Sequence, residues 1–185
     1  MSLKNSSDRY SPLVVGMHWL MLALLIAVYA SMELRDFAPK GSALRADLKT
    51  LHFLLGLSVL VLVAVRLGVR WGAGEAPPVH PPMPGWQDRF ARLMHYALYA
   101  FMIAMPLLGW LTLSAAGKPV VLLGWTVPVL IAPDEALSRL FKDAHELLAT
   151  AGYFLIGLHA SAALVHHYVT CDNTLLRILP GRRTP

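Results

Sequence analysis

The sequence predicts an all-α integral membrane protein in which four antiparallel helices form one bundle. Two features carry this prediction: the composition of the 185-residue chain and the spacing of its uncharged runs. Hydrophobic residues make up 56% and charged residues 15% of the chain, against roughly 45–50% and about 25% in soluble domains. A 20.3 kDa globule cannot bury so much apolar surface, so lipid must cover part of it. This composition excludes a disordered chain, a disulfide scaffold and a typical cytosolic enzyme.

Four uncharged runs are long enough to be membrane spans, because a bilayer core of about 30 Å needs roughly 20 apolar residues as a helix. We expect helices at residues 12–32, 48–69, 91–116 and 145–170. The first run has no Asp, Glu, Lys or Arg, and the second is shorter and ends at Arg66. The third and fourth are long enough to cross with tilt. The alternation typical of barrel strands is absent, so helix is the state that satisfies the backbone in lipid.

The connections between these runs complete a single domain over residues 1–185. The proline-rich connection from Gly72 to Gly85 predicts a stiff surface link between two helical hairpins. Residues 120–132 are apolar, but this run of 13 residues contains Pro128, so we expect it at the membrane interface. The N-terminus is too polar before Ser11, and the first apolar run too long, for a cleavable signal peptide.

The Lys and Arg residues behind the formal net charge of +5 lie almost wholly between the apolar runs, so we interpret them as membrane-edge charges and expect no nucleic-acid site. Nine of them fall on the side of the N-terminus: Lys4, Arg9, Arg66, Arg70, Arg89, Arg92, Arg177, Arg182 and Arg183. Seven fall on the other side: Arg35, Lys40, Arg45, Lys49, Lys118, Arg139 and Lys142. The positive-inside rule therefore predicts that both termini are cytoplasmic.

Histidines within the predicted spans are the main candidates for function, because ionisable groups in a bilayer are costly. The single cysteine, Cys171, excludes an intrachain disulfide and a Cys-ligated cluster, so a bound metal would depend on histidine. His145 and His159 are fourteen residues apart, which is ~21 Å and nearly four whole turns of helix. They therefore share one helix face at two membrane depths, and the other predicted helices place His18 at the depth of His159 and His52 at the depth of His145.

Two imidazoles from different helices at each of two levels indicate two bis-histidine haems, since a haem iron takes axial ligands from opposite sides of the porphyrin. A zinc site would instead need three or four ligands at one level. Gly152 lies between His145 and His159 on their helix face, and Gly56 lies one turn after His52. Missing side chains there would leave space for a flat macrocycle, and the alternative is close helix packing. For any one histidine alone, the alternative is a hydrogen-bonded contact between helices.

The remaining candidates have weaker patterns. Arg66 is fourteen residues after His52 and would suit a haem propionate or a quinone carbonyl, or else it snorkels to the headgroups. His166 is seven residues beyond His159 and could touch a second ligand, or it lies in the headgroup region. His95 has no partner left at its level, and we expect His167 in the headgroup region and His80 in solvent.

Several segments resemble the prokaryotic cytochrome b561 family, in particular its superoxide oxidase type. They are HWL at His18, LHFLLG at His52, VAVRLGVR at the end of the second run, and HELLATAGYFLIGLHASAALVHHYVTCDNTLLRILP from His145 to Pro180. The last of these is long and specific, and the resemblance covers nearly the whole chain. It implies a helical bundle with two b-type haems, one held by His18 and His159 and one by His52 and His145.

The resemblance also implies a role in the bacterial inner membrane. Superoxide would be oxidised to dioxygen on the periplasmic side, and the electron would pass through the two haems to ubiquinone, with His166 at a position that the family associates with quinone. Cations on that outer side, including Lys40, Arg45 and Lys49, could attract superoxide. One alternative is a cytochrome b subunit that links a dehydrogenase or soluble cytochrome to the quinone pool. Another is a haem-free transporter or scaffold.

Overall fold

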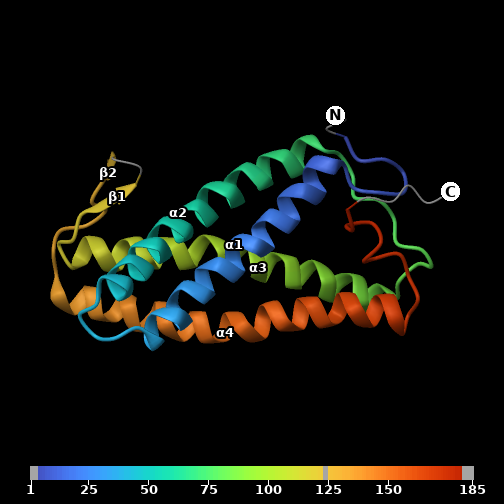
Figure 1. Ribbon diagram of the computed structural model, residues 1–185. Coiled ribbons are helices and arrows are strands. Elements are labelled where there is room, and N and C mark those ends of the chain that lie inside the picture. The colour runs from blue at the N-terminus through green and yellow to red at the C-terminus, as the bar shows by residue number, and fades with distance from the viewer. Residues whose placement is uncertain (1–3, 123–124, 181–185) are drawn as a thin grey trace. The chain divides into compact units, whose positions relative to one another are not determined.

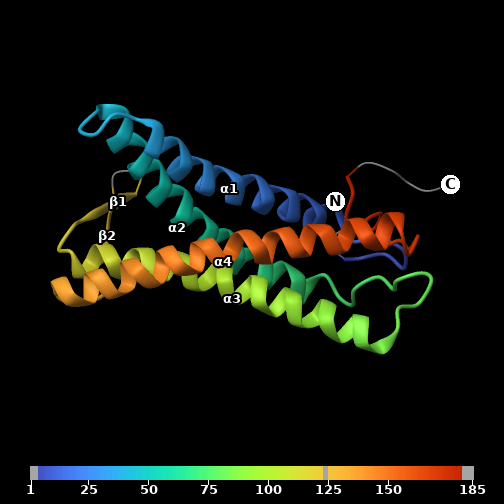
Figure 2. The ribbon, with the colours of Figure 1, turned by 90° about the horizontal axis from the view of Figure 1, so that it is seen from below.

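The computed structural model describes residues 4–122 and 125–180, and four helices dominate this part of the chain (Figure 1). They are α1 (Pro12–Phe37), α2 (Ala43–Gly72), α3 (Gly85–Ala115) and α4 (Glu135–Tyr168). All four are long and apolar enough to cross a membrane. The prediction of an all-α integral membrane helix bundle is confirmed, and Figure 2 shows the same helices from below. Arg182 and Arg183, counted above among the charges beside the N-terminus, lie outside the described residues.

The helices extend beyond the apolar runs at five of their eight ends, and α4 begins ten residues before the expected position 145. The added turns are polar and carry ion pairs between residues four apart, which stabilise a helix in water. Arg139 lies 3.0 Å from Glu135 at the start of α4, and Arg92 lies 2.8 Å from Asp88 at the start of α3. A search for uncharged residues finds the hydrocarbon-crossing part of a helix and misses such ends.

The chain divides into two compact units, each with segments of all four helices. Unit 1 comprises Met1–Met21, Leu62–Tyr99 and Tyr153–Pro185, and unit 2 comprises Leu22–Val61 and Ala100–Gly152. Every one of the four helices runs from one unit into the other. The single-domain organisation expected from the sequence stays a prediction.

In unit 1, backbone and side-chain hydrogen bonds join the segments that flank its helices. The Asn5 amide N–H donates to the Ala73 carbonyl at 2.9 Å, next to the end of α2. The Trp19 indole N–H, from α1, donates to the Ile178 carbonyl at 2.8 Å. Arg177 is buried, with 8% of its surface exposed, and donates to the Pro77 carbonyl. These bonds satisfy polar groups at the end of the apolar region, where a bundle needs partners for its backbone.

Unit 2 contains a two-stranded hairpin between α3 and α4. Strand β1 (Val120–Leu122) pairs antiparallel with β2 (Trp125–Val127). The sequence analysis expected an interfacial segment here and did not predict strands, although Val, Thr and Trp favour them. Residues 123–124, which fall inside that expected segment, lie outside the described residues. The Trp110 indole N–H donates to the Pro128 carbonyl at 2.9 Å, which attaches the end of the hairpin to α3.

Gly152 marks a close contact between helices in unit 2. A Cβ at this position would overlap the Tyr29 hydroxyl of α1 and the Phe101 ring of α3. The Tyr29 hydroxyl donates to the Ala149 carbonyl of α4 at 2.8 Å, so it lies against the α4 backbone where the glycine leaves room. The space at Gly152 is filled by two side chains, which corresponds to the close-packing alternative left open by the sequence.

We expect Gly152→Ala to lower the thermal stability of the detergent-solubilised protein, because its Cβ requires Tyr29 and Phe101 to move. Overpacking of this kind costs about 1–3 kcal/mol, or several degrees in Tm for a chain of this size. The matched control is Gly157→Ala, whose Cβ would meet nothing within 4 Å. The control should leave Tm unchanged or raise it, because alanine favours helix. Equal Tm values for the two variants would contradict this packing.

The turn after α4 is held by the carboxylate of Asp172. The side chain of Asp172 is fully covered, and its Oδ1 accepts from the Thr174 amide N–H at 2.8 Å. Its Oδ2 lies 2.5 Å from Nδ1 of His166. Burial alone would raise the pKa of the Asp172 carboxyl, but the hydrogen bonds from His166 and Thr174 outweigh burial and lower it. The ionised carboxylate therefore stabilises the folded turn.

Because the folded state lowers this pKa, Asp172 stabilises the protein above its unfolded pKa of about 3.9. That contribution is lost as the pH falls through the folded-state pKa. We expect wild-type protein to exceed Asp172→Asn in Tm at pH 7 and the difference to shrink below about pH 4. Thermal unfolding of both proteins from pH 7 to pH 3 measures this difference in Tm. A difference in Tm that grows on acidification would rule out this role.

Candidate functional site

In unit 2, His52 of α2 and His145 of α4 face each other, with ring centroids 6.0 Å apart. Nδ1 of His52 lies 3.2 Å from the Val28 carbonyl oxygen of α1. Since a carbonyl can only accept, this contact places the ring proton on Nδ1 and leaves Nε2 of His52 with a free lone pair. The Ser31 hydroxyl donates to the same carbonyl at 2.6 Å and lies 3.4 Å from Nδ1. The ring is thus oriented from α1 with Nε2 free to bind a metal.

A pocket lies between these two histidines. It is lined by His52, Phe53, Gly56, Leu57, Pro106, Gly109, Trp110, Leu113 and His145. A Cβ at Gly56 would meet nothing within 4 Å, so this glycine faces open space beside His52. A Cβ at Gly109 would lie 3.5 Å from Cε1 of His145, so the second glycine lets α3 approach the imidazole closely. The lining is mostly apolar with two imidazoles, which is typical of a haem-binding pocket.

In unit 1, His18 of α1 and His159 of α4 have ring centroids 6.4 Å apart. His95 of α3 joins them, with its centroid 5.4 Å from that of His159. Nδ1 of His95 lies 2.7 Å from the Ala91 carbonyl, so its ring proton is on Nδ1 and its Nε2 is unprotonated. The sequence analysis left His95 without a partner, whereas the structure places it beside the histidine pair. Within the described ranges, no group of three or more His, Cys, Asp or Glu could hold a metal ion.

Arg66 contacts the same group of residues in unit 1. Its Nη2 lies 3.2 Å from Nδ1 of His18, and its guanidinium lies 5.9 Å from the centre of the Tyr99 ring. Arg70 lies over the same ring at 5.8 Å. A guanidinium only donates, so in this arrangement Nδ1 of His18 accepts and the ring proton is on Nε2. Binding of a metal through Nε2 would therefore require Arg66 to release His18.

The spacing of both histidine pairs fits a haem iron. Two metal–nitrogen bonds of about 2 Å, together with roughly 1.1 Å from each nitrogen to its ring centre, would place two trans imidazole centroids about 6 Å apart. The observed separations are 6.0 Å in unit 2 and 6.4 Å in unit 1. Nδ1 of His145 in unit 2 is buried, and among the described residues it has no partner within hydrogen-bonding geometry. The centroid separations of both pairs are thus compatible with ligation of a haem iron, which in unit 1 would also require Arg66 to release His18.

The contacts of His80, His166 and His167 are with residues outside the two histidine pairs. His166 contacts Asp172 at the end of α4, and the ring of His167 packs against Tyr168 with centroids 4.7 Å apart. The backbone N–H of His80 donates to the Asn173 side chain, which fixes the proline-rich connection to the turn after α4. Arg66 and His166, proposed together as quinone residues from the sequence, thus each have a different immediate partner within unit 1.

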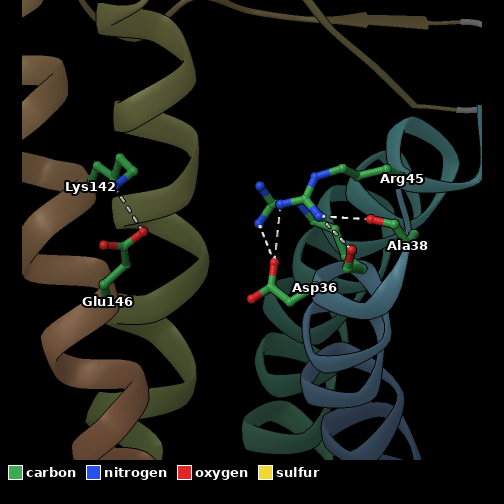
Figure 3. A network of polar contacts seen from close by, with 6 residues as sticks. Asp36, Ala38, Arg45, Lys142 and Glu146 are labelled. Carbon is green, nitrogen blue, oxygen red and sulfur yellow. Dashed lines mark hydrogen bonds and ion pairs between the residues drawn. The ribbon is translucent and has the colours of Figure 1, made fainter. Parts of the chain in front are cut away.

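Cations gather on unit 2 near its loops. Figure 3 shows Arg45 bound to Asp36 at 3.3 Å and to the Ala38 carbonyl at 3.1 Å, and Lys142 bound to Glu146 at 2.9 Å. These charges are therefore partly compensated. Lys49 differs, because its ammonium lies 5.7 Å from the centre of the Phe53 ring, and Phe53 lines the pocket of His52 and His145.

Sequence reasoning missed two residues at these sites. Gly109 follows Pro106 by three residues inside α3, and a proline and a glycine in one membrane helix could have indicated a close approach. Asp172 is a carboxylate next to the end of a predicted span, and its partner His166 lies six residues earlier in the chain. No periodicity links these two residues, because the chain leaves the helix between them.

The model of the prokaryotic cytochrome b561 family matches residues 9–181. The chain is 40% identical to cytochrome b561 homolog 1 of Escherichia coli over 176 residues, which are 95% of this chain and 99% of that protein. It is 39% identical to a probable superoxide oxidase of Yersinia pestis over 175 residues, 95% and 98% of the two chains. It is 30% identical to cytochrome b562 of Cereibacter sphaeroides over 179 residues, 94% and 96% of the two chains.

These matches extend over almost the full length of every protein compared, and the family resemblance inferred from the sequence is confirmed. Four membrane-crossing helices and histidine pairs at haem spacing agree with that match. The chain belongs to the prokaryotic cytochrome b561 family and is a multi-pass bacterial membrane redox protein that binds b-type haem.

Proposed function

We propose that this protein oxidises superoxide to dioxygen and reduces ubiquinone, using two b-type haems as its electron carriers. One observation carries the proposal: each compact unit holds one pair of imidazoles from different helices at the spacing of trans haem ligands. Two such pairs would let one chain accept an electron in one unit and donate it from the other. The similarity to a probable superoxide oxidase supports superoxide as the donor.

His52 and His145 would hold the haem of unit 2, and His18 and His159 that of unit 1. Haem supplies a reversible one-electron couple, whose potential depends on the axial ligands, the hydrogen bonds to them and the surrounding dielectric. The Val28 carbonyl fixes the His52 tautomer for this role. Gly56 provides open space beside His52, whereas Gly152 is occupied by neighbouring side chains and serves packing.

Arg66 would exchange partners when haem binds. A haem-ligating imidazole usually donates its second N–H, and Arg66 now occupies Nδ1 of His18 as a competing donor. A propionate is anionic and forms a bidentate pair with guanidinium, so it would draw Arg66 away from the ring. The guanidinium of Arg70, which lies 5.8 Å from the centre of the same Tyr99 ring, could share that anion.

Ubiquinone would bind at unit 1, where His166 and Arg66 offer donors for its carbonyl oxygens. His166 is partly exposed, with 17% of its side chain accessible, so a ligand could reach part of it. Reduction of a quinone consumes protons, and a histidine is the side chain that exchanges protons most readily near neutral pH.

Superoxide would approach unit 2 from the periplasm, with both termini of the chain in the cytoplasm. Lys49 lies over a pocket residue and carries a charge that no ion pair among the described residues cancels. A cation so placed raises the local concentration of a small anion.

A second candidate is an electron-transfer subunit that connects a dehydrogenase or soluble cytochrome to the quinone pool. The favouring observation is that two relatives, cytochrome b561 homolog 1 and cytochrome b562, are named as cytochromes without any substrate. Membership of a haem-binding family excludes the haem-free transporter or scaffold considered from the sequence.

The deciding experiment uses the purified protein alone with an enzymatic source of superoxide and ubiquinone-1. We expect haem reduction followed by quinol formation, both abolished by superoxide dismutase. Ubiquinone-1 that stays oxidised while superoxide is supplied, although the haem can be reduced by dithionite, would favour the subunit role.

We expect the wild-type protein to contain two haems per chain and each axial-ligand variant to retain one. His52→Ala or His145→Ala should lose the haem of unit 2, and His18→Ala or His159→Ala that of unit 1, because one remaining imidazole binds haem weakly. The ratio of pyridine haemochrome to protein measures this. His167→Ala is the control and should keep both haems. A wild-type ratio of one would refute the two-haem arrangement.

We expect Lys49→Gln to slow superoxide-dependent haem reduction several-fold at low ionic strength and to reduce its salt dependence, because a cation over the pocket residue Phe53 is lost. Lys142→Gln is the matched control, since Glu146 already compensates its charge. Stopped-flow haem absorbance at two or more salt concentrations gives both rates. If the two variants behave alike, charge attraction at Lys49 plays no part.

A further inference from the structure

We propose that Asp172 is the positioning residue that makes His166 the proton donor for quinone reduction. The inference rests on the proposed binding of ubiquinone beside His166, and it adds a residue to which no role was assigned from the sequence. Three observations carry it: the buried carboxylate, the direction of its hydrogen bonds and the partial exposure of the His166 side chain.

The carboxylate is held on both oxygens. Oδ1 accepts the Thr174 amide N–H at 2.8 Å, and Oδ2 lies 2.5 Å from Nδ1 of His166. The Asp172 amide N–H in turn donates to the His166 carbonyl at 3.0 Å, so the two residues are joined through backbone and side chain. The Asp172 side chain is fully covered, whereas 17% of the His166 side chain is exposed. The pair has one buried acceptor and one accessible ring.

An ionised carboxylate can only accept, so it fixes a proton on Nδ1 of His166. Nε2 is then the atom that gains and loses protons. The same carboxylate stabilises the imidazolium that forms when Nε2 is protonated, as a buried acid does for the histidine of a catalytic triad. To hold the turn after α4, the carboxylate needs only to accept from the Thr174 N–H; the contact of its second oxygen with Nδ1 of His166 also fixes the proton of the imidazole ring.

The proton balance is simple. Two electrons and two protons convert ubiquinone to ubiquinol, and in the proposed reaction two superoxide anions supply the electrons and leave as dioxygen. The imidazolium of His166 gives its Nε2 proton to a quinone oxygen and becomes neutral with Nδ1–H still bound to Asp172. Water then reprotonates Nε2, and a second transfer completes the quinol.

Asp172→Asn tests the positioning directly, because the Thr174 N–H selects the orientation of the new amide. The amide oxygen must stay with that donor, so the amide NH₂ replaces Oδ2 and faces His166. Nδ1 then becomes an acceptor, and the neutral ring carries its proton on Nε2. ¹⁵N NMR of histidine-labelled, haem-loaded protein in the reduced state reads the tautomer, and the His166→Gln spectrum assigns the signal.

We expect neutral His166 to be protonated on Nδ1 in wild-type protein and in Asp172→Glu, and on Nε2 in Asp172→Asn. Neutral wild-type His166 with its proton on Nε2 would overturn the proposal, and this outcome does not depend on how well the Asp172 variants fold.

The kinetic measurement is the rate at which ubiquinone-1 reoxidises dithionite-reduced haem in anaerobic stopped flow, which involves no superoxide. We expect roughly a 10²-fold loss in Asp172→Asn and in His166→Gln, partial recovery in Asp172→Glu, and no loss in the control Asp8→Asn, which removes an exposed carboxylate. Fast wild-type reoxidation with an equally fast Asp172→Asn overturns the proton role alone. Wild-type haem that ubiquinone-1 does not oxidise overturns the quinone step of the proposed function itself.

Discussion

The pairing of imidazoles across an apolar bundle is the constraint on which the rest of this structure depends. Each ring must come from a different helix, lie at the depth of its partner and leave one nitrogen free. Helix geometry meets the first two conditions. Residues 145 and 159 share one face of α4 at two depths, and each meets a histidine of another helix, His52 of α2 or His18 of α1. The third depends on hydrogen bonds to the other nitrogen: Val28 supplies an acceptor for His52 and Ala91 one for His95. A carbonyl from α1 thus leaves Nε2 of His52 free in unit 2, and the carbonyl one turn before His95 does the same for His95 in unit 1.

The sequence predicted the helices and the two histidine pairs because both depend on simple regularities. Long apolar runs follow from the thickness of a bilayer, and matched depths follow from counting along helices of known rise. The hairpin of β1 and β2 was not predicted, since six paired residues in a short apolar connection resemble an interfacial loop equally well. Tyr29 and Gly152 were not predicted to meet, because their contact depends on how α1 and α4 cross.

The contact between Asp172 and His166 was not predicted from the sequence for a different reason. Its bonds to His166 and Thr174 form in a turn after the last helix, where Cys171 adopts a positive φ of 57°. A left-handed residue that is not glycine is uncommon, and no pattern of hydrophobicity predicts it. The backbone reverses at this residue and brings the Asp172 carboxylate back to the end of α4. Asp172 therefore contacts His166, although helical periodicity relates neither residue to the other.

Arg66 illustrates how one side chain can serve two states of such a site. With its contact to Nδ1 of His18, the guanidinium satisfies a polar nitrogen within a mostly apolar bundle and stacks on Tyr99. Because Nδ1 of His18 accepts from Arg66, the ring proton is on Nε2, the nitrogen that would bind a metal. The contact therefore opposes metal ligation. An anionic group in the site removes the opposition, because guanidinium binds a carboxylate more strongly than a neutral imidazole. Haem carries both a metal and carboxylates, so under the proposed ligation the group that would need His18 would also bring the anion that releases it.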